Sequence, residues 1–363
     1  MSLSNDELEI LLGLVDEIEP EPGLVDTLLH EVQAGAKLTP AHVQDLQGAI
    51  SRSTDQVRPD LLAVLAVHAI LTDAWSLIPA VSSLAPDDVD GVLLGLESVH
   101  RKRDPGPACW NWLQDVHKAD PSKTRRIYNI LEEGVKSGWS LEDRSEEFFT
   151  ALRLPPQGKG RFQVDLGQTA GRILLHGLQQ TSQREQLLLR LAAIASDRKD
   201  AGSLPAVRCL AADAGYRNEW ERIEPLMQKP REAGAAIDGT DSAVHFHTRQ
   251  NKTPELAAGA LPLLLRALQQ GNTAVRNQAL NILWTMSYWG RLKVDQALPE
   301  ADRALSDAKL RVNAIRLMGA IAAQDPSTVE PYRASLEAHA DDKNRSVRAA
   351  LAEARFAMRS PGS

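Results

Sequence analysis

This sequence of 363 residues has little of what secreted, metal-binding and membrane-spanning proteins depend on. Its two cysteines, Cys109 and Cys209, are too few and too far apart for a disulfide framework or a metal cluster. Aromatic residues make up only 4% of the chain, which favours helices over strands. The longest apolar run, Leu61 to Leu71, contains His68, is too short to cross a bilayer, and predicts a buried helix.

Signatures of catalysis are also missing. There is no dinucleotide-binding glycine pattern and no nucleophile elbow. Carboxylate pairs such as Glu132-Glu133 are adjacent in sequence, so on a helix they diverge by about 100° and cannot share a proton across a site. We therefore expect no cofactor and no resident metal, and we favour a protein that is not an enzyme.

Charge is unevenly distributed. The net charge is −7, but residues 1–60 carry twelve acidic and three basic residues, a net of −9, which leaves +2 for the rest. The acidic N-terminal region argues against nucleic acid binding there and leaves the question open elsewhere. The start of the chain, MSLSNDELEI, lacks the basic residues of a signal peptide, so we expect a soluble cytoplasmic protein with no membrane segment.

A repeat near the C-terminus is the most informative feature that is present. Three segments, offset by 35 and 37 residues, carry apolar side chains at i, i+4, i+7 and i+11, which places them on one face of a helix. An arginine follows the first stripe residue each time. The stripes begin at Val275, Leu310 and Val347, and the arginines are Arg276, Arg311 and Arg348. A recurring two-helix unit of this length predicts stacked helical hairpins.

These segments resemble HEAT repeats of the armadillo-like superfamily. The matching residues are Asn272 with Val275-Arg276, Asp307 with Leu310-Arg311, and Asp342 with Val347-Arg348. The resemblance is clear over 253–358 and weaker over 60–225. It implies an all-α fold, a right-handed α-α superhelix (solenoid) of stacked antiparallel helical hairpins. It also implies that the three arginines are structural and link neighbouring repeats, although Asn272 stands where the family pattern has aspartate.

The chain is predicted to have five parts. They are an irregular acidic helical cap (1–58), degenerate HEAT-like hairpins (59–228), a polar loop (229–253), three HEAT-like repeats (254–359) and a disordered tail (360–363). Within the second part, 77–84 with 89–99 and 107–117 with 121–136 are expected hairpins. The softest boundary is expected near residue 240, and the Pro- and Gly-rich stretch 155–162 is the other place where the chain could divide.

Polar and aromatic positions on the last repeats predict a partner-binding surface. Trp284 and Tyr288 are four residues apart on one helix, so they are neighbours and offer an aromatic anchor of the type that dominates binding energy. Packing against the adjacent repeat is the alternative role for them. The remaining candidates are Asn277, Gln278, Asn281, Asn313 and Arg316.

A basic cluster between residues 101 and 126 predicts a second kind of surface. Seven basic and three acidic residues give a net of +4, and Trp110 and Trp112 lie between them. Cations with interleaved aromatics can hold a phosphate backbone and stack a base. A solvated helix end explains the charges equally well, and one of the two tryptophans is expected in the core. The candidate nucleic-acid contacts are Arg101, Lys102, Arg103, Lys123, Arg125 and Arg126.

Two minor motifs have simple alternatives. His245 and His247 would share one face of an extended segment and could bind a metal with Asp238 and Asp241, but solvated loop histidines are more common. The stretch 158–161, GKGR, could cradle an anion, yet it lacks the full phosphate-loop pattern.

Three functional hypotheses remain open. The first is a scaffold that binds a protein or peptide on the concave face of the solenoid, with an unknown oligomeric state. The second is a nucleic-acid-binding protein, or a HEAT-like DNA repair glycosylase with a basic concave groove, a group whose active-site residues have no match in this chain. The third is a chromophore lyase or its partner subunit, a role that HEAT-like repeats also have and that no residue here specifically supports.

Overall fold

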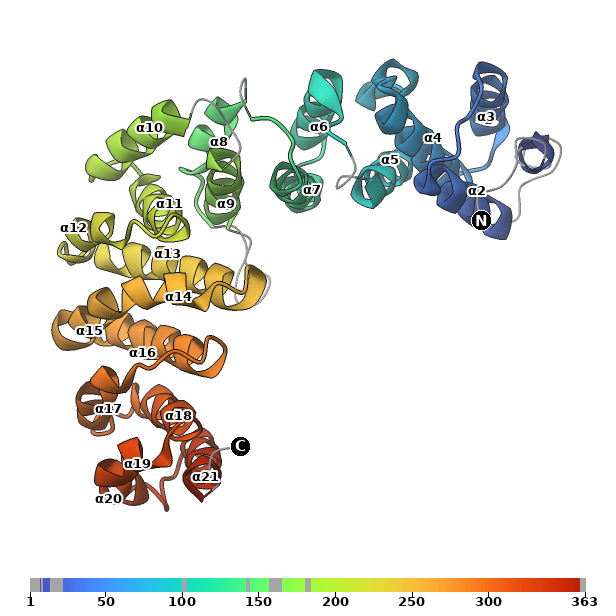
Figure 1. The fold of residues 1–363 in the computed structure, drawn as a ribbon. Coiled ribbons are helices and arrows are strands. Elements are labelled where there is room, and N and C mark those ends of the chain that lie inside the picture. Colours follow the sequence, from blue (N-terminus) through green and yellow to red (C-terminus); the bar gives the residue numbers. More distant parts are fainter. Residues whose placement is uncertain are drawn as a thin grey trace. The chain divides into compact units, whose positions relative to one another are not determined.

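The structure is a computed structural model that describes residues 7, 9–13, 22–99, 103–141, 144–156, 165–179 and 184–359. Over these residues the chain forms helices and their connections, with no strand. It divides into two compact units, Met1–Arg184 and Glu185–Ser363, which we call unit 1 and unit 2 (Figure 1). The all-α prediction is confirmed. No helix within the described ranges is long and apolar enough to cross a membrane.

In its described ranges, unit 1 is built from α-helices and short 3-10 turns. Its helix α4 is buried along ten consecutive residues, Leu61 to Ile70, because α2, α3 and α5 all pack against it. The sequence predicted this buried helix. The helices of unit 1 are α2 (Pro22–Ala34), α3 (Pro40–Arg52), α4 (Arg58–Thr72), α5 (Pro86–Val99), α6 (Gly106–Ala119), α7 (Thr124–Lys136), α8 (Ser145–Ala151) and α9 (Leu166–Leu178).

One predicted hairpin of unit 1 is wrong. Residues 77–84 form no α-helix but two separate short turns, Trp75–Leu77 and Val81–Ser83, divided by Pro79. The partner of α5 is α4, and the two helices approach closely at Gly91 and Gly95, where a Cβ would meet the backbone of α4 at 2.0 and 2.5 Å. Proline removes a backbone donor and therefore interrupted the expected helix.

Unit 2 is a two-layer stack. Helices α11, α13, α16, α18 and α21 pack one against the next and form the layer that we call the B layer, while α12, α15 and α17 follow one another beside it (Figure 1). The helices of unit 2 are α10 (Arg184–Ser196), α11 (Ser203–Tyr216), α12 (Glu224–Met227), α13 (Ala233–His245), α14 (Pro254–Ala257), α15 (Leu261–Gln270), α16 (Thr273–Tyr288), α17 (Leu298–Ala304), α18 (Arg311–Ala322), α19 (Pro326–Val329), α20 (Arg333–Glu337) and α21 (Arg345–Arg359).

The three predicted B helices of the repeats correspond to α16, α18 and α21, and their apolar stripes are buried. Asn272 begins α16 by accepting a hydrogen bond from the backbone N–H of Val275 at 3.0 Å. This satisfies one of the donors that every helix start leaves free. Asp325 caps α19 in the same way, with Pro326 at the first helical position.

The expected polar loop at 229–253 is wrong, and so is the boundary near residue 240. This stretch contains α13, followed by one wide π-helical turn, Phe246–Gln250. Its buried residues do follow a helical period, but most are small: Ala233, Ala236, Ile237, Gly239, Thr240, Ala243 and Val244. Small side chains let α13 pack closely on α11, and α16 covers it on the other side, so the chain is continuous in unit 2 at residue 240.

Candidate functional site

The aromatic pair predicted on α16 forms a surface stack. The rings of Trp284 and Tyr288 lie 5.3 Å apart with their planes 18° from parallel. Trp289 follows directly and meets Tyr288 edge to face at 5.1 Å. Tyr288 is 50% exposed and Trp289 47% exposed, whereas Trp284 is half-buried. Neighbouring aromatic side chains left this open on one surface are uncommon, which makes this cluster a candidate contact site.

These aromatics line one wall of a hollow of about 500 Å³, which we call the Trp284 hollow. The opposite walls come from α18 and α21 and consist mainly of alanine and glycine. Gly319 backs directly onto Ala354, where an added Cβ would lie 3.2 Å from the Ala354 backbone. The hollow exists because the aromatic residues of α16 face side chains too small to fill the space: Gly319, Ala320, Ala323, Ala350, Ala354 and Ala357.

Charged groups surround the hollow. Arg316 of α18 lines it and is exposed, and the guanidinium of Arg249 lies 4.6 Å from the ring centre of Trp289. Neither arginine forms an ion pair with any described residue, whereas Glu353 adds one carboxylate on the α21 side. The hollow therefore combines apolar walls with an excess of positive charge at its edge.

The polar residues predicted around the pair bridge neighbouring helices of the B layer. Asn313 of α18 donates to Asn277 of α16 at 3.0 Å, and Gln278 of α16 donates to Asp241 of α13 at 3.0 Å. Asn281 is half-buried on the same helix. Of the residues predicted to bind a partner, Trp284, Tyr288 and Arg316 lie at this hollow, whereas Asn277, Gln278 and Asn313 bond to neighbouring helices.

Histidines 245 and 247 do not share a face, because the segment is helical rather than extended. The Nδ1 atom of His245 lies 3.3 Å from a carboxylate oxygen of Asp241, and this contact raises the pKa of His245 above its ordinary value of 6.5. His247 is buried, with its two ring nitrogens 3.0 Å from Thr253 Oγ1 and from the carbonyl oxygen of Gly215. No group of three potential metal ligands occurs among the described residues.

The repeat arginines differ from one another. Arg311 reaches the turn of the next repeat and pairs with Asp342 at 2.5 Å, as the resemblance implied. Arg348 donates to the carbonyl oxygen of Asp342. Arg276 makes no such link to any described residue, and its buried Nε has no hydrogen-bond partner among them. Asp307, which precedes Arg311 as Asp342 precedes Arg348, accepts instead from the N–H of Lys309.

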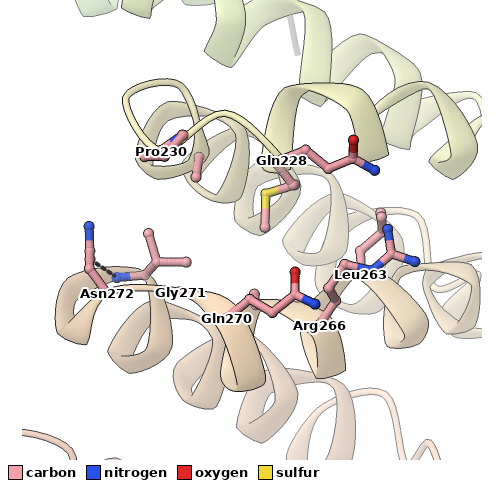
Figure 2. Close-up of a pocket in the computed structure, with 11 residues that line it drawn as sticks. Gln228, Pro230, Leu263, Arg266, Gln270, Gly271 and Asn272 are labelled. Atoms are coloured by element: carbon pink, nitrogen blue, oxygen red, sulfur yellow. Dashed lines mark hydrogen bonds between the residues drawn. The ribbon is translucent and has the colours of Figure 1, made fainter.

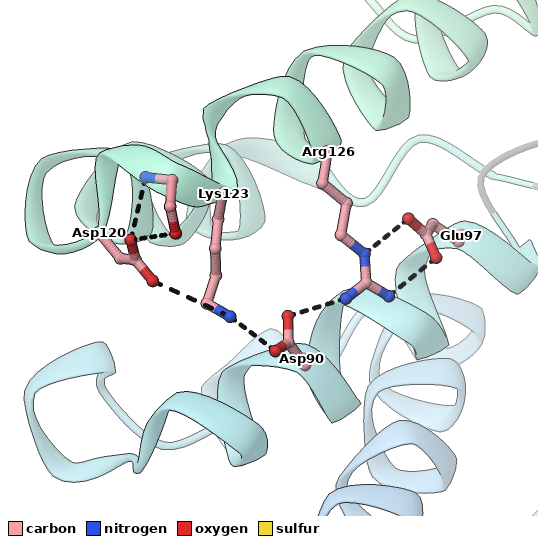
Figure 3. A network of polar contacts seen from close by, with 6 residues as sticks. Asp90, Glu97, Asp120, Lys123 and Arg126 are labelled. Atoms are coloured by element: carbon pink, nitrogen blue, oxygen red, sulfur yellow. Dashed lines mark hydrogen bonds and ion pairs between the residues drawn. The ribbon is translucent and has the colours of Figure 1, made fainter. Parts of the chain in front are cut away.

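Two cations of the basic cluster of unit 1, Lys123 and Arg126, are paired with acidic residues of α5 and of the turn before α7. Arg126 of α7 pairs with Glu97 at 2.7 Å and with Asp90 at 2.9 Å, and Lys123 pairs with Asp90 at 2.7 Å and approaches Asp120 at 3.9 Å (Figure 3). These contacts link α7 to α5, so Lys123 and Arg126 serve first to join neighbouring hairpins.

The other cations of the cluster and the two tryptophans lie in different surroundings. Arg103 donates to the carbonyl oxygen of Leu71 at 2.9 Å, and Arg125 is exposed. Arg101 and Lys102 lie outside the described residues, as do 158–161 and the predicted tail 360–363. Trp110 and Trp112 are both core residues, 2% and 6% exposed, which agrees with the expectation that at least one of them is buried and leaves neither open to stack on a base.

A second hollow of unit 2, of about 420 Å³, lies between α12 and α15 (Figure 2). Arg266, Gln228 and Gln270 border it, and no aromatic side chain lines it. Arg266 is already paired with Glu224, and the side chain of Asn272 caps α16. This hollow therefore offers fewer free groups to a partner than the Trp284 hollow does.

Comparison with known proteins shows the fold and nothing finer. No family model matches the chain, and no curated protein matches it. Among solved structures it is similar to Kap121p bound to Pho4p, with a TM-score of 0.53, and to Kap121p bound to Nup53p, with a TM-score of 0.52. Both are 11% identical to it and match over 98% of this chain and 46% of their own, so the chain spans less than half of their length.

Karyopherins such as Kap121p are HEAT-repeat solenoids. The chain is therefore a HEAT-like α-solenoid, which confirms the resemblance drawn from Val275-Arg276, Leu310-Arg311 and Val347-Arg348.

Some features of the site were missed from the sequence. Arg249 was assigned to a loop, and its position over Trp289 depends on the wide turn after α13. The alanines on α18 and α21 carried no signal of their own, because alanine is also the most common filler of helix interfaces. The i, i+4 aromatic pair was the one signal that pointed to this place.

Proposed function

We propose that unit 2 is a protein-binding scaffold and that it takes a segment of a partner protein across the free face of α16, α18 and α21, the face that we assign to the concave side. The observation that carries this proposal is the Trp284 hollow, in which a partly exposed aromatic wall faces a floor of small residues. A solenoid with such a face suits extended partners, because neighbouring repeats present a continuous surface.

The apolar walls of the Trp284 hollow and the arginines beside it indicate which kind of partner segment would fit. An aromatic or long aliphatic side chain would enter the hollow and stack on Trp284 and Tyr288, since such anchors provide most of the energy of an interface. An aspartate or glutamate beside it would reach Arg316 or Arg249, neither of which has an ion-pair partner in the described part of the chain. We therefore propose a segment with an apolar anchor next to an acidic residue.

Selection from a phage library of random twelve-residue peptides on the full chain tests the proposal. The selected peptides are expected to combine an aromatic, leucine or methionine residue with aspartate or glutamate. Trp284→Ala and Arg316→Glu are each expected to weaken binding of a selected peptide at least about tenfold. Leu189→Ala is the matched control, because Leu189 is 71% exposed in unit 2 and does not line the hollow.

Two results would contradict this function. The first is an absence of enriched peptides, and the second is enrichment of peptides whose affinity is unchanged in Trp284→Ala. A titration with labelled duplex DNA at two salt concentrations distinguishes peptide binding from nucleic acid binding. Tight binding that weakens steeply with salt and is lost in Arg125→Glu would replace the peptide proposal with a nucleic acid partner.

The two cysteines bear on the compartment in which the protein acts. Cys109 and Cys209 are both buried and are not joined in a disulfide, which is compatible with a reducing compartment. We propose that the protein works in the cytoplasm, and localisation of the tagged full chain in its own cells tests this.

A further inference from the structure

Unit 1 contains a hollow that the proposed peptide binding does not use. It has a volume of about 410 Å³ and lies among α6, α7 and α8. This volume falls within the range of small-molecule sites, on the order of 300–1,000 Å³. We call it the Tyr128 hollow.

The walls are aromatic and apolar because α6, α7 and α8 each turn one apolar face toward the hollow. Phe148 of α8 lies at the centre, edge to face with Trp110 at 6.1 Å and with Tyr128 at 6.3 Å. Leu113, Ile127, Leu131, Ala151 and Leu154 complete the apolar lining. A lining of aromatic and apolar side chains favours an aromatic guest, which can pack on these walls.

A few polar groups line the hollow and could orient a bound molecule. The hydroxyl of Tyr128 makes no hydrogen bond with any described residue, and burial raises the pKa of Tyr128 to about 12, so the hydroxyl stays a neutral donor. His117 is held by a 2.7 Å contact between its Nδ1 and Thr124 Oγ1, and this leaves its Nε2 without a partner in the described residues. Two groups of opposite charge, Lys118 and Glu147, also line the hollow.

We propose that the Tyr128 hollow is a binding site for an uncharged aromatic molecule of one or two rings that carries a hydrogen-bond acceptor. The rings of the ligand fill the hollow against the lining side chains of Phe148 and Tyr128, and its acceptor atom accepts a hydrogen bond from the Tyr128 hydroxyl. An uncharged ligand is favoured because the lining charges cancel and because apolar walls penalise a buried charge. This inference concerns unit 1 alone and does not depend on the peptide site.

Prodan, an uncharged naphthyl ketone whose emission shifts to the blue in apolar surroundings, is the probe for the test. Titrated into the full chain, it is expected to bind saturably at one site with a blue shift. Tyr128→Phe removes only the hydroxyl and is expected to raise the Kd about threefold to tenfold, the range for one neutral hydrogen bond.

Thr150→Trp is designed to close the entrance. Thr150 is exposed at the edge of the hollow, and its hydroxyl bonds only to the carbonyl oxygen of Glu146, so the fold should tolerate the change. The variant is expected to abolish binding. Ser196→Trp is the matched control, because Ser196 is an exposed helical residue whose hydroxyl also bonds to a carbonyl of its own helix.

Trp284→Ala, which alters the hollow of unit 2, is expected to leave prodan binding unchanged. The proposal is overturned if prodan shows no saturable binding, or if binding persists in Thr150→Trp while circular dichroism shows an intact fold. Loss of prodan binding in Trp284→Ala would also overturn it, because the probe would then report the other hollow. Lys118→Trp repeats the entrance test from α6 and so checks the result with Thr150→Trp.

Discussion

Arg126 of α7 donates two parallel hydrogen bonds to the carboxylate of Glu97 in α5, over 2.7 and 2.9 Å. Its third contact, to Asp90 at 2.9 Å, brings in a second carboxylate from the same helix. These contacts raise the pKa of Arg126, so the cation persists at any accessible pH. A bidentate pair of this kind fixes the orientation of two helices better than a single contact does.

Removing this guanidinium is expected to weaken unit 1. Arg126→Ala should lower the free energy of unfolding by about 1 kcal/mol, because Asp90 and Glu97 lose a shared cation at a partly exposed site. Arg125→Ala, one residue earlier and exposed, should change it by less than about 0.5 kcal/mol. Urea unfolding followed by circular dichroism measures both. Equal effects of the two variants would show that the network does not join the hairpins.

Close packing of α13 on α11 depends on Gly239. A Cβ at this position would lie 2.4 Å from the carbonyl oxygen of Arg208 and 2.7 Å from the Cβ of Ala211. Gly239→Ala is therefore expected to lower the melting temperature, with a cost of about 1–3 kcal/mol for overpacking.

Gly234 offers the control in the same helix, because a Cβ there would meet no described atom within 4 Å beyond the adjacent backbone of its own helix. Gly234→Ala should be neutral or raise stability by about 0.5 kcal/mol through its better helix propensity. Scanning calorimetry of the two variants gives the comparison. A stable Gly239→Ala variant would mean that the two helices are farther apart than described.

His245 should titrate above its ordinary pKa of 6.5, because its contact with the Asp241 carboxylate favours the charged imidazolium. A raised folded-state pKa means that the contact stabilises the fold fully below about 6.5 and that this stabilisation is lost as the pH rises through the folded value. NMR titration of the His245 ring proton measures the pKa. Asp241→Asn should lower it, and an unchanged value would show that the carboxylate is not the cause.

The two thiols should be unreactive in the folded protein. Burial raises the pKa of Cys209 to about 12 and raises that of Cys109 well above its ordinary value, so almost no thiolate forms near neutral pH. Ellman's reagent at pH 8 should detect no thiol in the native chain and two thiols after unfolding in urea. Rapid reaction of the native protein would indicate that α6 or α11 opens readily.

Helices that bury large side chains could be predicted from the sequence, whereas a helix that buries small ones could not. Val275, Leu310 and Val347 begin stripes of large apolar residues, and these three helices were placed correctly. Helix α13 buries Ala236, Gly239 and Ala243 at the same period, but residues this small do not stand out against a polar background. Its place in the B layer comes from contacts with α11 and α16, which no local pattern encodes.

The candidate site could also be predicted only in part from the sequence. Trp284 and Tyr288 could be paired from the sequence because they lie on one helix. The small-residue floor that makes a hollow beside them belongs to two other helices and depends on how closely those helices pack. In unit 1, Arg126 and Glu97 are 29 residues apart, so the basic cluster looked free until the fold placed its carboxylates.

The wide turn at Phe246–Gln250 makes the candidate site sensitive to the deletion of a single residue. A π-helical turn holds one more residue than an α-helical turn, so it acts as a one-residue insertion that alters the helical phase of the residues after it. That phase brings Arg249 over Trp289 and His247 to the Gly215 carbonyl. Deletion of a single residue here would rotate Arg249 away from the aromatic cluster, so a small genetic event could alter the charge at the site while leaving α16, α18 and α21 untouched.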